Sequence, residues 1–377
     1  MRVIPLASGK GGVGKSLFAA NLAAAFAQAG SRVVLADLDL GASNLHLALG
    51  VRAPKSGIGA FLSGGVSFSA CVTGTDIPRL RFIAGDTEIP GIANLKAAQI
   101  KALAKNLLGL ADTADILILD LGAGSHQAII DFFLLSKGGI VISAPALPAI
   151  LGAYVFLKNA VFRLLVTSFP RGTKARAALE AGGAGGGPLS IPRLFKQIEQ
   201  IDEPAYRAFR KRFDAWRPQL IVNFLTDRKD SDAASKIRRS CNEFLCLRVD
   251  CLGAAYRDSL QDTALASGIP IILYKPDCLL SRAVYRIADK IRETPEEALP
   301  PDERQIEARF QEADAEAAAD FAERGDYIGE LLHSGLLSAG ELAETVKTQQ
   351  IEINKLRKEN NFLKYTLANA LQKRQMR

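Results

Sequence analysis

The stretch Val3-Ile-Pro-Leu-Ala-Ser-Gly-Lys-Gly-Gly-Val-Gly-Lys-Ser16 decides the fold, and it lies near the start of a chain of 377 residues. Its apolar first half has the composition of a buried strand, and an alanine-rich segment of about residues 15–29, typical of a helix, follows the loop. Between them, Gly9 to Ser16 fits the spacing G-x-x-x-x-G-K-[ST] of a phosphate-binding P-loop. The strand–loop–helix context that this motif requires is therefore present.

Each residue of the loop has a predicted role around the phosphates of a nucleotide. Glycines allow backbone N–H groups to approach the phosphates, whose charge the helix N-terminus also favours. We expect Lys15 to reach the β- and γ-phosphates and the Ser16 hydroxyl to ligate Mg²⁺. The predicted nucleotide-binding residues of the loop are Gly9, Lys10, Gly11, Gly12, Val13, Gly14, Lys15 and Ser16.

A second lysine, Lys10, lies inside this loop. Here the sequence resembles the MinD/ParA family of deviant-Walker P-loop ATPases, and within it the MinD branch with its flagellar-number regulators. The resemblance implies that two protomers enclose two ATP molecules and that Lys10 reaches the phosphates of the partner. A cation supplied in trans completes the charge stabilisation only when the partner is present. The resemblance thus implies ATP and Mg²⁺ as cofactors, a homodimer, and catalytic roles for Lys10 and Lys15.

The resemblance continues at Asp37-Leu-Asp-Leu-Gly-Ala-Ser-Asn-Leu45, which matches the first switch of the family, D-x-D-x-G-x-x-N-L. By position it implies that Asp39 orients the attacking water, as a catalytic residue, and that Asp37 supports the metal site. It also implies that Asn44 responds to the γ-phosphate. Taken without the resemblance, two acids at the exit of a strand are also compatible with solvated turn residues.

An apolar strand that ends in an acid, as a Walker B strand does, is predicted at Asp115–Asp120, so Asp120 is expected to hold Mg²⁺ through water. The next residues, Leu121–Gly124, resemble the second switch, whose glycines permit backbone motion. Asn223 matches the adenine-contacting asparagine of the family, although a strand-end turn residue is the alternative. After its fifth strand the MinD branch commonly has T-P-E-P-T, whereas this chain has Ala144-Pro-Ala-Leu-Pro148. The acid is lost, so a contact carried over to that position is in doubt.

Further apolar runs predict the strands of a parallel sheet with helices on both faces. They are Arg32–Asp37, Leu80–Ala84, Asp115–Asp120, Gly139–Ser143, Gln219–Asn223 and Pro270–Leu273. The predicted fold class is α/β, a P-loop NTPase of the SIMIBI type, with a C-terminal helical and coiled-coil extension. We expect an ATPase domain over residues 1–293 with a basic insertion of helices and loop at about 165–215, a linker over 294–303, and a helical region over 304–377.

A heptad pattern near the C-terminus predicts a coiled coil at about residues 342–371. Its seam positions are Val346, Ile353, Asn360 and Leu367, and Leu342, Gln349, Leu356, Leu363 and Ala370. The single Asn360 favours two strands, and an amphipathic helix docked on the body is the alternative. The basic end, Lys373–Arg377, is also compatible with an anionic membrane.

The net charge of +7 is unevenly distributed. Residues 158–217 hold 12 basic against 5 acidic side chains and residues 345–377 hold 8 against 2, whereas residues 302–344 hold 3 against 12. Two basic segments suggest an anionic partner, either a membrane surface or DNA, and solvated helix faces are an equal alternative. Trp216, in the basic insertion, either packs in the interior or faces such a partner.

The five cysteines form no Cys-x-x-Cys pair, so reduced thiols are expected. The switch segments contain no cysteine, which disfavours an iron–sulfur carrier. The chain shows no secretory signal and no apolar run close to the roughly 20 residues of a membrane span. We therefore expect a cytoplasmic protein, with peripheral attachment to the inner face of the cell membrane as an option.

The leading hypothesis is an ATP-dependent dimerising switch that hydrolyses ATP and positions a cellular structure on an anionic surface. Such a structure is a division site, a flagellum or another polar assembly, and an activating protein partner stimulates release. The alternatives are a ParA-like DNA-binding partition ATPase, an iron–sulfur carrier ATPase, and a coiled-coil scaffold with a degenerate ATPase.

Overall fold

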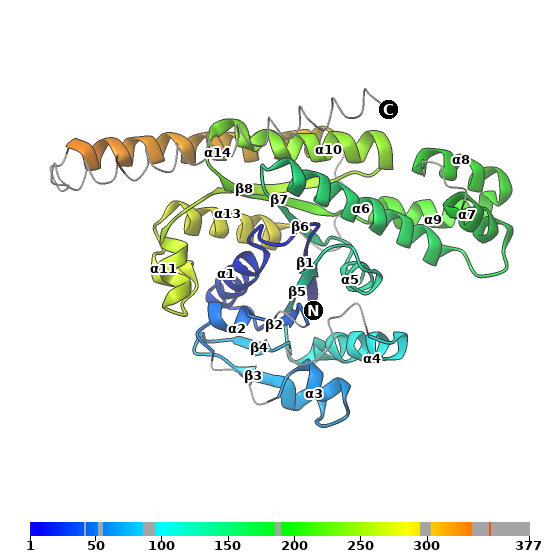
Figure 1. Cartoon of the computed structure of the whole chain (residues 1–377), viewed down its shortest axis with the longest axis horizontal. Coiled ribbons are helices and arrows are strands. Elements are labelled where there is room, and N and C mark those ends of the chain that lie inside the picture. The colour runs from blue at the N-terminus through cyan, green and yellow to red at the C-terminus, as the bar shows by residue number, and fades with distance from the viewer. Residues whose placement is uncertain are drawn as a thin grey trace, which may run out of the picture. The chain divides into compact units, whose positions relative to one another are not determined.

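A computed structural model describes residues 1–40, 43–51, 56–85, 95–184, 190–294, 303–333 and 347 of the chain (Figure 1). The chain divides into two compact units, Met1–Phe321 and Ala322–Arg377. Nearly all of the described residues belong to the first unit, which holds the sheet. The predicted coiled coil at about 342–371 lies outside the described residues, apart from Lys347.

The first unit is built on an eight-stranded sheet with the strand order β3-β4-β2-β5-β1-β6-β7-β8. Every neighbouring pair is parallel except β3 and β4, which are antiparallel. The strands are β1 (Arg2–Ser8), β2 (Val33–Leu38), β3 (Val72–Gly74), β4 (Leu80–Ile83), β5 (Ile116–Ala123), β6 (Ile140–Ser143), β7 (Gln219–Leu225) and β8 (Asp250–Tyr256). The sheet confirms the predicted α/β fold.

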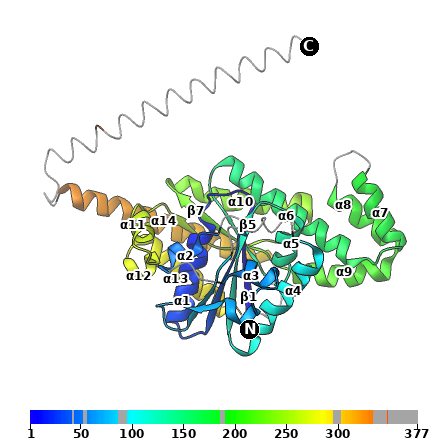
Figure 2. The ribbon, with the colours of Figure 1, turned by 60° about the horizontal axis from the view of Figure 1, so that its bottom comes forward.

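Helices cover both faces of this sheet (Figures 1 and 2). On one face, α1 (Lys15–Gln28), α12 (Ile271–Tyr274) and α13 (Leu279–Glu293) share a hydrophobic core with the strands. The other core contains α4 (Ala97–Leu108), α5 (Gln127–Phe133), α6 (Leu147–Ser168), α10 (Asp232–Leu245) and the first part of α14 (Glu303–His333). Shorter helices are α2 (Leu45–Ala48), α3 (Ile58–Leu62) and α11 (Leu260–Ala266).

The prediction of a strand at Pro270–Leu273 was wrong, because Ile271–Tyr274 forms the short helix α12. The amide of Ile272 donates a hydrogen bond to Asn21 Oδ1 of α1 at 3.2 Å, and Ile271 and Ile272 are buried in the core beside α1 and α13. A run of four apolar residues has the same composition in a buried strand and in a buried helical turn, so periodicity cannot separate the two.

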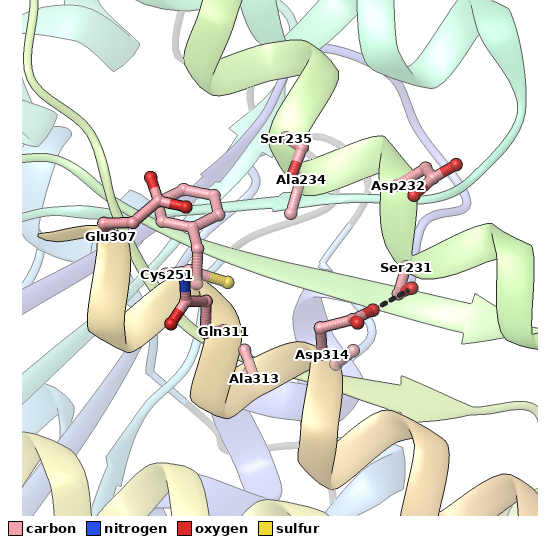
Figure 3. A pocket seen from close by; sticks show the side chains of 12 residues that line it. Ser231, Asp232, Ala234, Ser235, Cys251, Glu307, Gln311, Ala313 and Asp314 are labelled. Atoms are coloured by element: carbon pink, nitrogen blue, oxygen red, sulfur yellow. Dashed lines mark hydrogen bonds between the residues drawn. The ribbon is translucent and has the colours of Figure 1, made fainter.

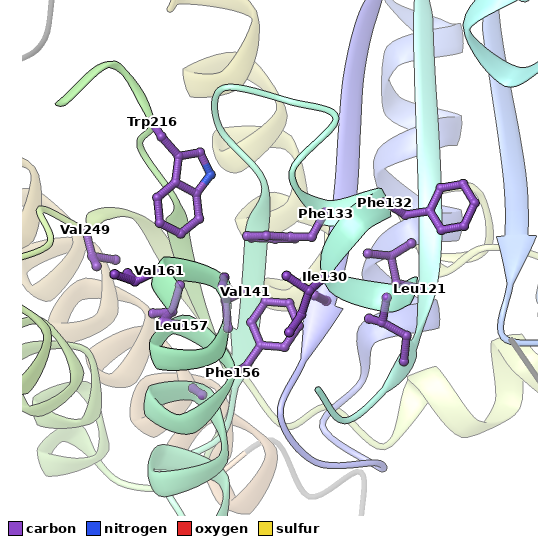
Figure 4. Packing of buried hydrophobic residues seen from close by; sticks show 14 of the residues in the cluster. Leu121, Ile130, Phe132, Phe133, Val141, Phe156, Leu157, Val161, Trp216 and Val249 are labelled. Carbon is purple, nitrogen blue, oxygen red and sulfur yellow. The ribbon is translucent and has the colours of Figure 1, made fainter. Parts of the chain in front are cut away.

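The prediction that the chain has no apolar segment of membrane-spanning length also needs correction. Helix α6, Leu147–Ser168, is 22 residues long and apolar enough to cross a membrane by length and composition alone. Half of its most apolar window is buried inside the protein. The buried side chains, among them Phe156, Leu157 and Val161, belong to the hydrophobic core against the sheet, which is the packing of a core helix (Figure 4).

Trp216 lies in this core and does not face outward (Figure 4). It is 5% exposed, and its ring packs edge-on against Phe133 with the centroids 6.3 Å apart. Phe133 in turn contacts Phe156 of α6, with centroids 4.9 Å apart. Of the two alternatives for Trp216, packing in the interior is therefore the one that the structure supports.

Between α6 and β7 the chain forms a helical arm, which consists of α7 (Lys174–Ala184), α8 (Ile191–Ile201) and α9 (Glu203–Ala215). The arm extends to one side of the sheet in both views (Figures 1 and 2). Aromatic rings pack together inside it, with Phe195 lying 5.3 Å from both Phe209 and Phe213. This arm occupies most of the segment predicted as a basic insertion, and residues 185–189 of the predicted glycine-rich loop lie outside the described residues.

Helix α14 packs on the first unit as far as Phe321, beyond the predicted domain boundary at residue 293. Ile306, Phe310, Ala313 and Ala317 are buried there. The hydroxyl of Tyr256, at the end of the edge strand β8, donates a hydrogen bond to the carbonyl of Ala317 at 2.9 Å. A cavity of about 180 Å³ remains between α14, α10 and β8, and the Ser231 hydroxyl donates to Asp314 Oδ1 at 2.6 Å on its wall (Figure 3).

Candidate nucleotide site

A pocket of about 470 Å³ lies at the carboxyl ends of the strands, where the loops of a parallel sheet gather. This volume is in the range of small-molecule sites. Of the predicted site residues, the pocket brings together Gly11, Gly12, Gly14, Lys15, Ser16, Asp39, Asn44 and Asn223. Gly9, Lys10, Val13, Asp37 and Asp120 do not line it.

Register within the sheet explains why distant parts of the sequence meet here. Strand β5 lies between β1 and β2, with Leu6 and Asp37 both opposite Asp120. The P-loop that leaves β1, the first switch that leaves β2 and the acid near the end of β5 therefore share one edge of the sheet. This arrangement follows from the parallel pairing alone, because parallel strands end at the same edge.

Two glycines of the P-loop have backbone conformations that favour glycine. Gly12 has a φ of 78° and Gly14 a φ of 86°, both in the left-handed region. A Cβ atom on Gly14 would lie 2.2 Å from Asn223 Nδ2, which is closer than any real contact. The loop therefore needs glycine at position 14 for its backbone angle and for the approach of Asn223.

The P-loop and α6 are in close contact, which was not predicted from the sequence. A Cβ atom on Gly9 would lie 1.9 Å from the carbonyl oxygen of Gly152, so the two backbones touch. Gly152 lies within α6, and an isolated glycine inside a helical pattern often has a packing reason. That signal was present in the sequence, but only the fold identifies Gly9 as its partner.

Lys15 forms a buried ion pair with Asp120. The two side chains are 7% and 1% exposed, and Lys15 Nζ donates a hydrogen bond to Asp120 Oδ1. Burial raises the pKa of Asp120, and the charge of Lys15 opposes that effect. The second oxygen of Asp120, Oδ2, is buried and has no hydrogen-bond partner among the described residues.

Mg²⁺ fits the residues around Lys15 and Asp120, at the border of the pocket. It prefers oxygen ligands and usually binds through one or two carboxylates together with substrate phosphates. The free Oδ2 of Asp120 and the hydroxyl of Ser16, which interacts with the Asp120 carboxyl group, supply such oxygens. In the described part of the chain, no three His, Cys, Asp or Glu side chains are grouped to hold a metal. Any Mg²⁺ here would therefore depend on phosphate oxygens as well.

Asp37 organises the first switch. Its Oδ1 accepts a hydrogen bond from the amide of Asp39 at 3.0 Å, and its Oδ2 accepts from the Ser43 hydroxyl at 2.7 Å and from the amide of Leu45 at 3.2 Å. Burial and the neighbouring charge of Asp120 raise the pKa of Asp37 to about 6, against these hydrogen bonds. Because both carboxylate oxygens of Asp37 already accept hydrogen bonds, this geometry favours a role in which Asp37 supports the metal site without ligating the metal itself.

Asp39 lies where the two switches meet. It lines the pocket, and a Cβ atom on Gly122, in the second switch, would lie 3.0 Å from its Oδ1. Glycine at position 122 thus allows the second switch to approach the carboxylate that is predicted to orient water. Movement of either segment would change this contact.

Asn223 joins the P-loop to the far wall of the pocket. Its Nδ2 donates a hydrogen bond to the Val13 carbonyl at 3.0 Å, while its buried Oδ1 has no partner in the described part of the chain. The next residue, Phe224, has a φ of 62°, and the Arg257 guanidinium lies 5.7 Å from the centre of its ring. This wall offers a free acceptor and a flat aromatic ring, which together suit a nucleobase. Sequence reasoning did not anticipate Phe224 or Arg257.

Lys10 differs from Lys15 in its exposure, its position relative to the pocket and its contacts. It is exposed, it does not line the pocket, and it makes no hydrogen bond or ion pair with the residues that the structure describes. Its neighbour Gly9 is fixed against α6, so the backbone of this part of the loop is held in place. The side chain is thus available to a molecule outside its own chain.

Comparison with known proteins agrees with this geometry. The model of the CobQ/CobB/MinD/ParA nucleotide binding domain matches residues 4–375. The chain belongs to this family. Membership confirms the resemblance drawn from Lys10 and the two switches. Within the CobQ/CobB/MinD/ParA family the roles of single residues in this chain remain predictions.

Relatives with curated names match about two fifths of this chain. The antiactivator FleN of Pseudomonas aeruginosa is 29% identical over 159 residues, which are 42% of this chain and 56% of FleN. The flagellum site-determining protein YlxH of Helicobacter pylori is 30% identical, over 42% of this chain and 53% of YlxH. The septum site-determining protein MinD of Synechocystis is 32% identical, over 40% and 55%. The chain spans about half the length of the curated relatives it matches.

Solved structures of the family share the fold over most of their length. The cell division ATPase MinD of Pyrococcus furiosus has a TM-score of 0.51 at 18% identity and covers 78% of this chain and 98% of its own. A chain of the MinC:MinD cell division protein complex of Aquifex aeolicus has a TM-score of 0.52 at 18% identity, covering 80% of this chain and 99% of its own. At this level of identity the likeness supports the fold alone.

Proposed function

We propose that this protein is a Mg²⁺-dependent ATPase that acts as a dimerising switch and positions a cellular structure, such as a division site, a flagellum or another polar assembly. The observation that carries the proposal is the pair of lysines in one P-loop, with Lys15 buried at the pocket and Lys10 exposed outside it. Among the relatives that match part of this chain, YlxH is named a flagellum site-determining protein and MinD a septum site-determining protein. The fold and the site together support this class.

In the proposed reaction the chain holds the triphosphate and orients the attacking water. Backbone amides of the P-loop and Lys15 neutralise the phosphates, while Asp39 positions the water that attacks the γ-phosphate. Mg²⁺, when held by Ser16 and by Asp120 through water, supplies neutralisation of the charge that develops on the β- and γ-phosphates. Asn44 responds to the γ-phosphate, and Asn223 Oδ1 accepts a hydrogen bond from the amino group of adenine.

Dimerisation follows from the position of Lys10 in this proposal. An exposed cation beside a phosphate site stabilises developing charge only when it reaches a phosphate, and its own pocket does not include it. A second copy facing the first brings each Lys10 to the nucleotide of the other. Binding of ATP and pairing of the copies then depend on each other, which is the property of a switch.

The anionic surface that the dimer binds is proposed to contact the helical arm α7–α9. The apolar face of α8, with Ile191, Leu194 and Phe195, is buried in the arm, while Arg193 and Lys196 are exposed. Because α8 has no free apolar face to insert into a membrane, its exposed cations favour contact with phosphate groups through charge alone. DNA and the headgroups of an anionic membrane both offer such phosphates, and an activating protein partner is proposed to release the dimer from either surface.

An iron–sulfur carrier is disfavoured by the state of the cysteines. Burial raises the pKa of Cys241 and of Cys251 to about 12. The thiolate is the form that ligates iron, and burial in apolar surroundings disfavours it. None of the described cysteines lines the nucleotide pocket.

The experiment compares the full-length protein with Lys15→Ala and Lys10→Ala. We expect Lys15→Ala to abolish ATP binding, because it removes the cation at the phosphates, and Lys10→Ala to bind ATP but to hydrolyse it at least about tenfold more slowly. Equilibrium binding and phosphate release at several protein concentrations measure both. A Lys10→Ala protein that hydrolyses ATP at the wild-type rate would contradict the trans lysine.

The surface is tested with the Asp39→Ala protein, which should hold ATP without hydrolysing it. Binding to duplex DNA and to vesicles of anionic lipid is measured in low and high salt. We expect Arg193→Glu with Lys196→Glu to weaken binding to one of the two surfaces at least about tenfold. The matched control is Lys101→Glu with Lys105→Glu, two exposed cations on α4. Equal losses from both double variants would show that net charge, not the arm, is responsible.

A further inference from the structure

Tyr256 lies between the nucleotide pocket and α14. It is the last residue of β8, it lines the pocket, and it is 3% exposed. Its hydroxyl donates a hydrogen bond to the carbonyl of Ala317 in α14 at 2.9 Å, and the centre of its ring lies 6.0 Å from that of Phe321 on the same helix. One side chain therefore forms part of the pocket wall and part of the surface on which α14 docks.

A second contact joins α14 to the loop that follows β7. The Ser231 hydroxyl donates a hydrogen bond to Asp314 Oδ1 at 2.6 Å (Figure 3). The residue before it, Asp230, accepts a hydrogen bond from the amide of Thr226 at 2.7 Å, which fixes the turn directly after the strand. Strand β7 carries Asn223, which lines the pocket. Two neighbouring strands that end at this wall are thus tied to one helix.

The packing beneath α14 is incomplete. The cavity of about 180 Å³ is lined by Cys251 and Gly253 of β8 and by Phe310 of α14. The register of β8 against β7 also shifts here, between Leu220 and Ile221, as in a β-bulge. A void removes packing contacts from the atoms that line it. Hydrogen bonds and ion pairs around the cavity therefore contribute more to the docking of α14 than they would on a fully packed surface.

We propose that Tyr256 is a positioning residue for the nucleotide, and that its hydrogen bond to Ala317 couples the docking of α14 to the affinity for ATP. The inference rests on the proposed function, which places ATP in this pocket. While α14 is docked, the bond holds Tyr256, and with it the end of β8, in place at the pocket wall. When α14 detaches, the bond is lost, and ATP must order this wall as it binds, which weakens binding.

Such a coupling acts in both directions. If docked α14 raises the affinity for ATP by a certain factor, bound ATP raises the stability of docked α14 by the same factor. The exchange of amide hydrogens in residues 303–321 with solvent reports local opening of α14. We therefore expect ATP with Mg²⁺ to slow this exchange about three- to tenfold, which is the effect of about one hydrogen bond.

The test compares Tyr256→Phe with the wild type as full-length proteins. Phenylalanine keeps the ring at the pocket wall and removes only the hydroxyl. We expect the KM for ATP to rise about three- to tenfold and kcat to stay unchanged, because the P-loop and Asp39 are not altered. At saturating ATP, the slowing of exchange in residues 303–321 should be lost in this variant. A tyrosine that only stabilises the fold would not change the dependence of α14 on ATP.

Two controls match the two effects of the substitution. Tyr285→Phe also removes a hydroxyl with hydrogen bonds, to Gln28 at 2.9 Å and to the carbonyl of Ile272, but Tyr285 lies on α13 and does not line the pocket. It should keep the wild-type KM. Arg238→Glu loosens α14 from α10 and leaves the Tyr256 hydroxyl in place. Its exchange should be faster with and without ATP, with the ratio between the two conditions unchanged.

The outcomes separate this inference from the proposed function. If the wild type binds no ATP, the proposed function itself fails. If the wild type binds ATP without slower exchange in residues 303–321, α14 is not coupled to the pocket and the inference is wrong. The inference is also wrong if Tyr256→Phe keeps the wild-type KM and the wild-type ratio of exchange rates.

Discussion

At the scale of single residues, the nucleotide site depends on places where two backbones touch. Gly9 and Gly152 are the tightest of these, since a Cβ atom on Gly9 would lie 1.9 Å from the Gly152 carbonyl oxygen. A Cβ atom on Gly152 would meet Gly9 at 3.1 Å, which is a milder conflict. The P-loop is thus held by a helix that follows it by more than a hundred residues.

We expect Gly9→Ala to weaken ATP binding about ten- to a hundredfold, because overpacking costs about 1–3 kcal/mol and here displaces the loop. Gly152→Ala should have a smaller effect of the same sign. Gly74→Ala is the control, since nothing lies within 4 Å of a Cβ atom there. Isothermal titration calorimetry measures the three affinities, and wild-type affinity in Gly9→Ala would show that the loop is not held in this way.

The pKa of Asp37, raised to about 6, makes stability depend on pH. The pKa of Asp37 in the folded protein lies above the usual value near 3.8, so the protonated carboxyl group favours the folded state. This contribution to the free energy of unfolding is complete below pH 3.8 and is lost as the pH rises through about 6. Two pKa units correspond to about 3 kcal/mol. We expect the free energy of unfolding of the wild type to fall between pH 4 and 7 relative to that of Asp37→Asn.

Urea denaturation at several pH values measures this difference. Asp37→Asn loses part of the hydrogen bonding to Ser43 and Leu45, so its stability is lower overall but should change less with pH. Asp76→Asn, at an exposed position, serves as the control and should follow the wild type. Parallel pH curves for all three proteins would rule out Asp37 as the titrating group.

At the scale of elements, α14 is held along β8 by charge as well as by apolar contacts. Arg238 of α10 pairs with Glu303 and Glu307, and its guanidinium lies 4.8 Å from the centre of the Phe310 ring. Lys290 of α13 pairs with Glu316 at 2.9 Å on the other side. An edge strand presents unpaired backbone groups that can join another chain, and a covering helix protects it.

We expect Arg238→Glu to lower the free energy of local opening of α14 by about 1–2 kcal/mol. The two ion pairs with Glu303 and Glu307 become repulsive, and the contact with the Phe310 ring is lost. The Arg238 side chain is 19% exposed, so solvent screens these pairs only in part. Hydrogen exchange of residues 303–321 should become faster by about tenfold. Arg292→Glu, a change at an exposed residue that pairs with Asp289, should leave α14 unchanged. If adding Glu303→Arg and Glu307→Arg to the Arg238→Glu protein restores the slow exchange of α14, the effect is due to charge.

At the scale of the whole molecule, the first unit has a hydrophobic core on each face of one sheet, and the nucleotide pocket opens at the end that both cores share. Residues from β1, β2, β7 and β8 or from the loops after them line it. A ligand bound there contacts segments spread over more than two hundred residues. Binding therefore stabilises the folded unit as a whole.

We expect Mg²⁺ with ATP at 100 times its dissociation constant to stabilise the protein by about 2.7 kcal/mol, seen as a rise in melting temperature of several degrees. Differential scanning calorimetry measures the rise, which should need both Mg²⁺ and ATP for its full size. Lys15→Ala is the control and should show no rise. Equal shifts in wild type and Lys15→Ala would place the nucleotide elsewhere.

The sequence by itself determined the P-loop, the switches, the α/β class and most strands of the sheet. These features are local, since Gly9–Ser16 and Asp115–Asp120 carry their patterns within a few consecutive residues. Spacing and apolar runs of this kind survive in any context, so they can be interpreted without coordinates.

Only the tertiary structure decided that Ile271–Tyr274 forms a helix, that Trp216 is buried, and that Gly9 touches Gly152. The same holds for the docking of α14 on β8 and for the exposure of Leu147 and Leu151 on α6, which resemble core residues in sequence. Each depends on contacts between residues far apart in the chain. Burial and close approach are properties of a packed pair, and one member of the pair does not specify the other.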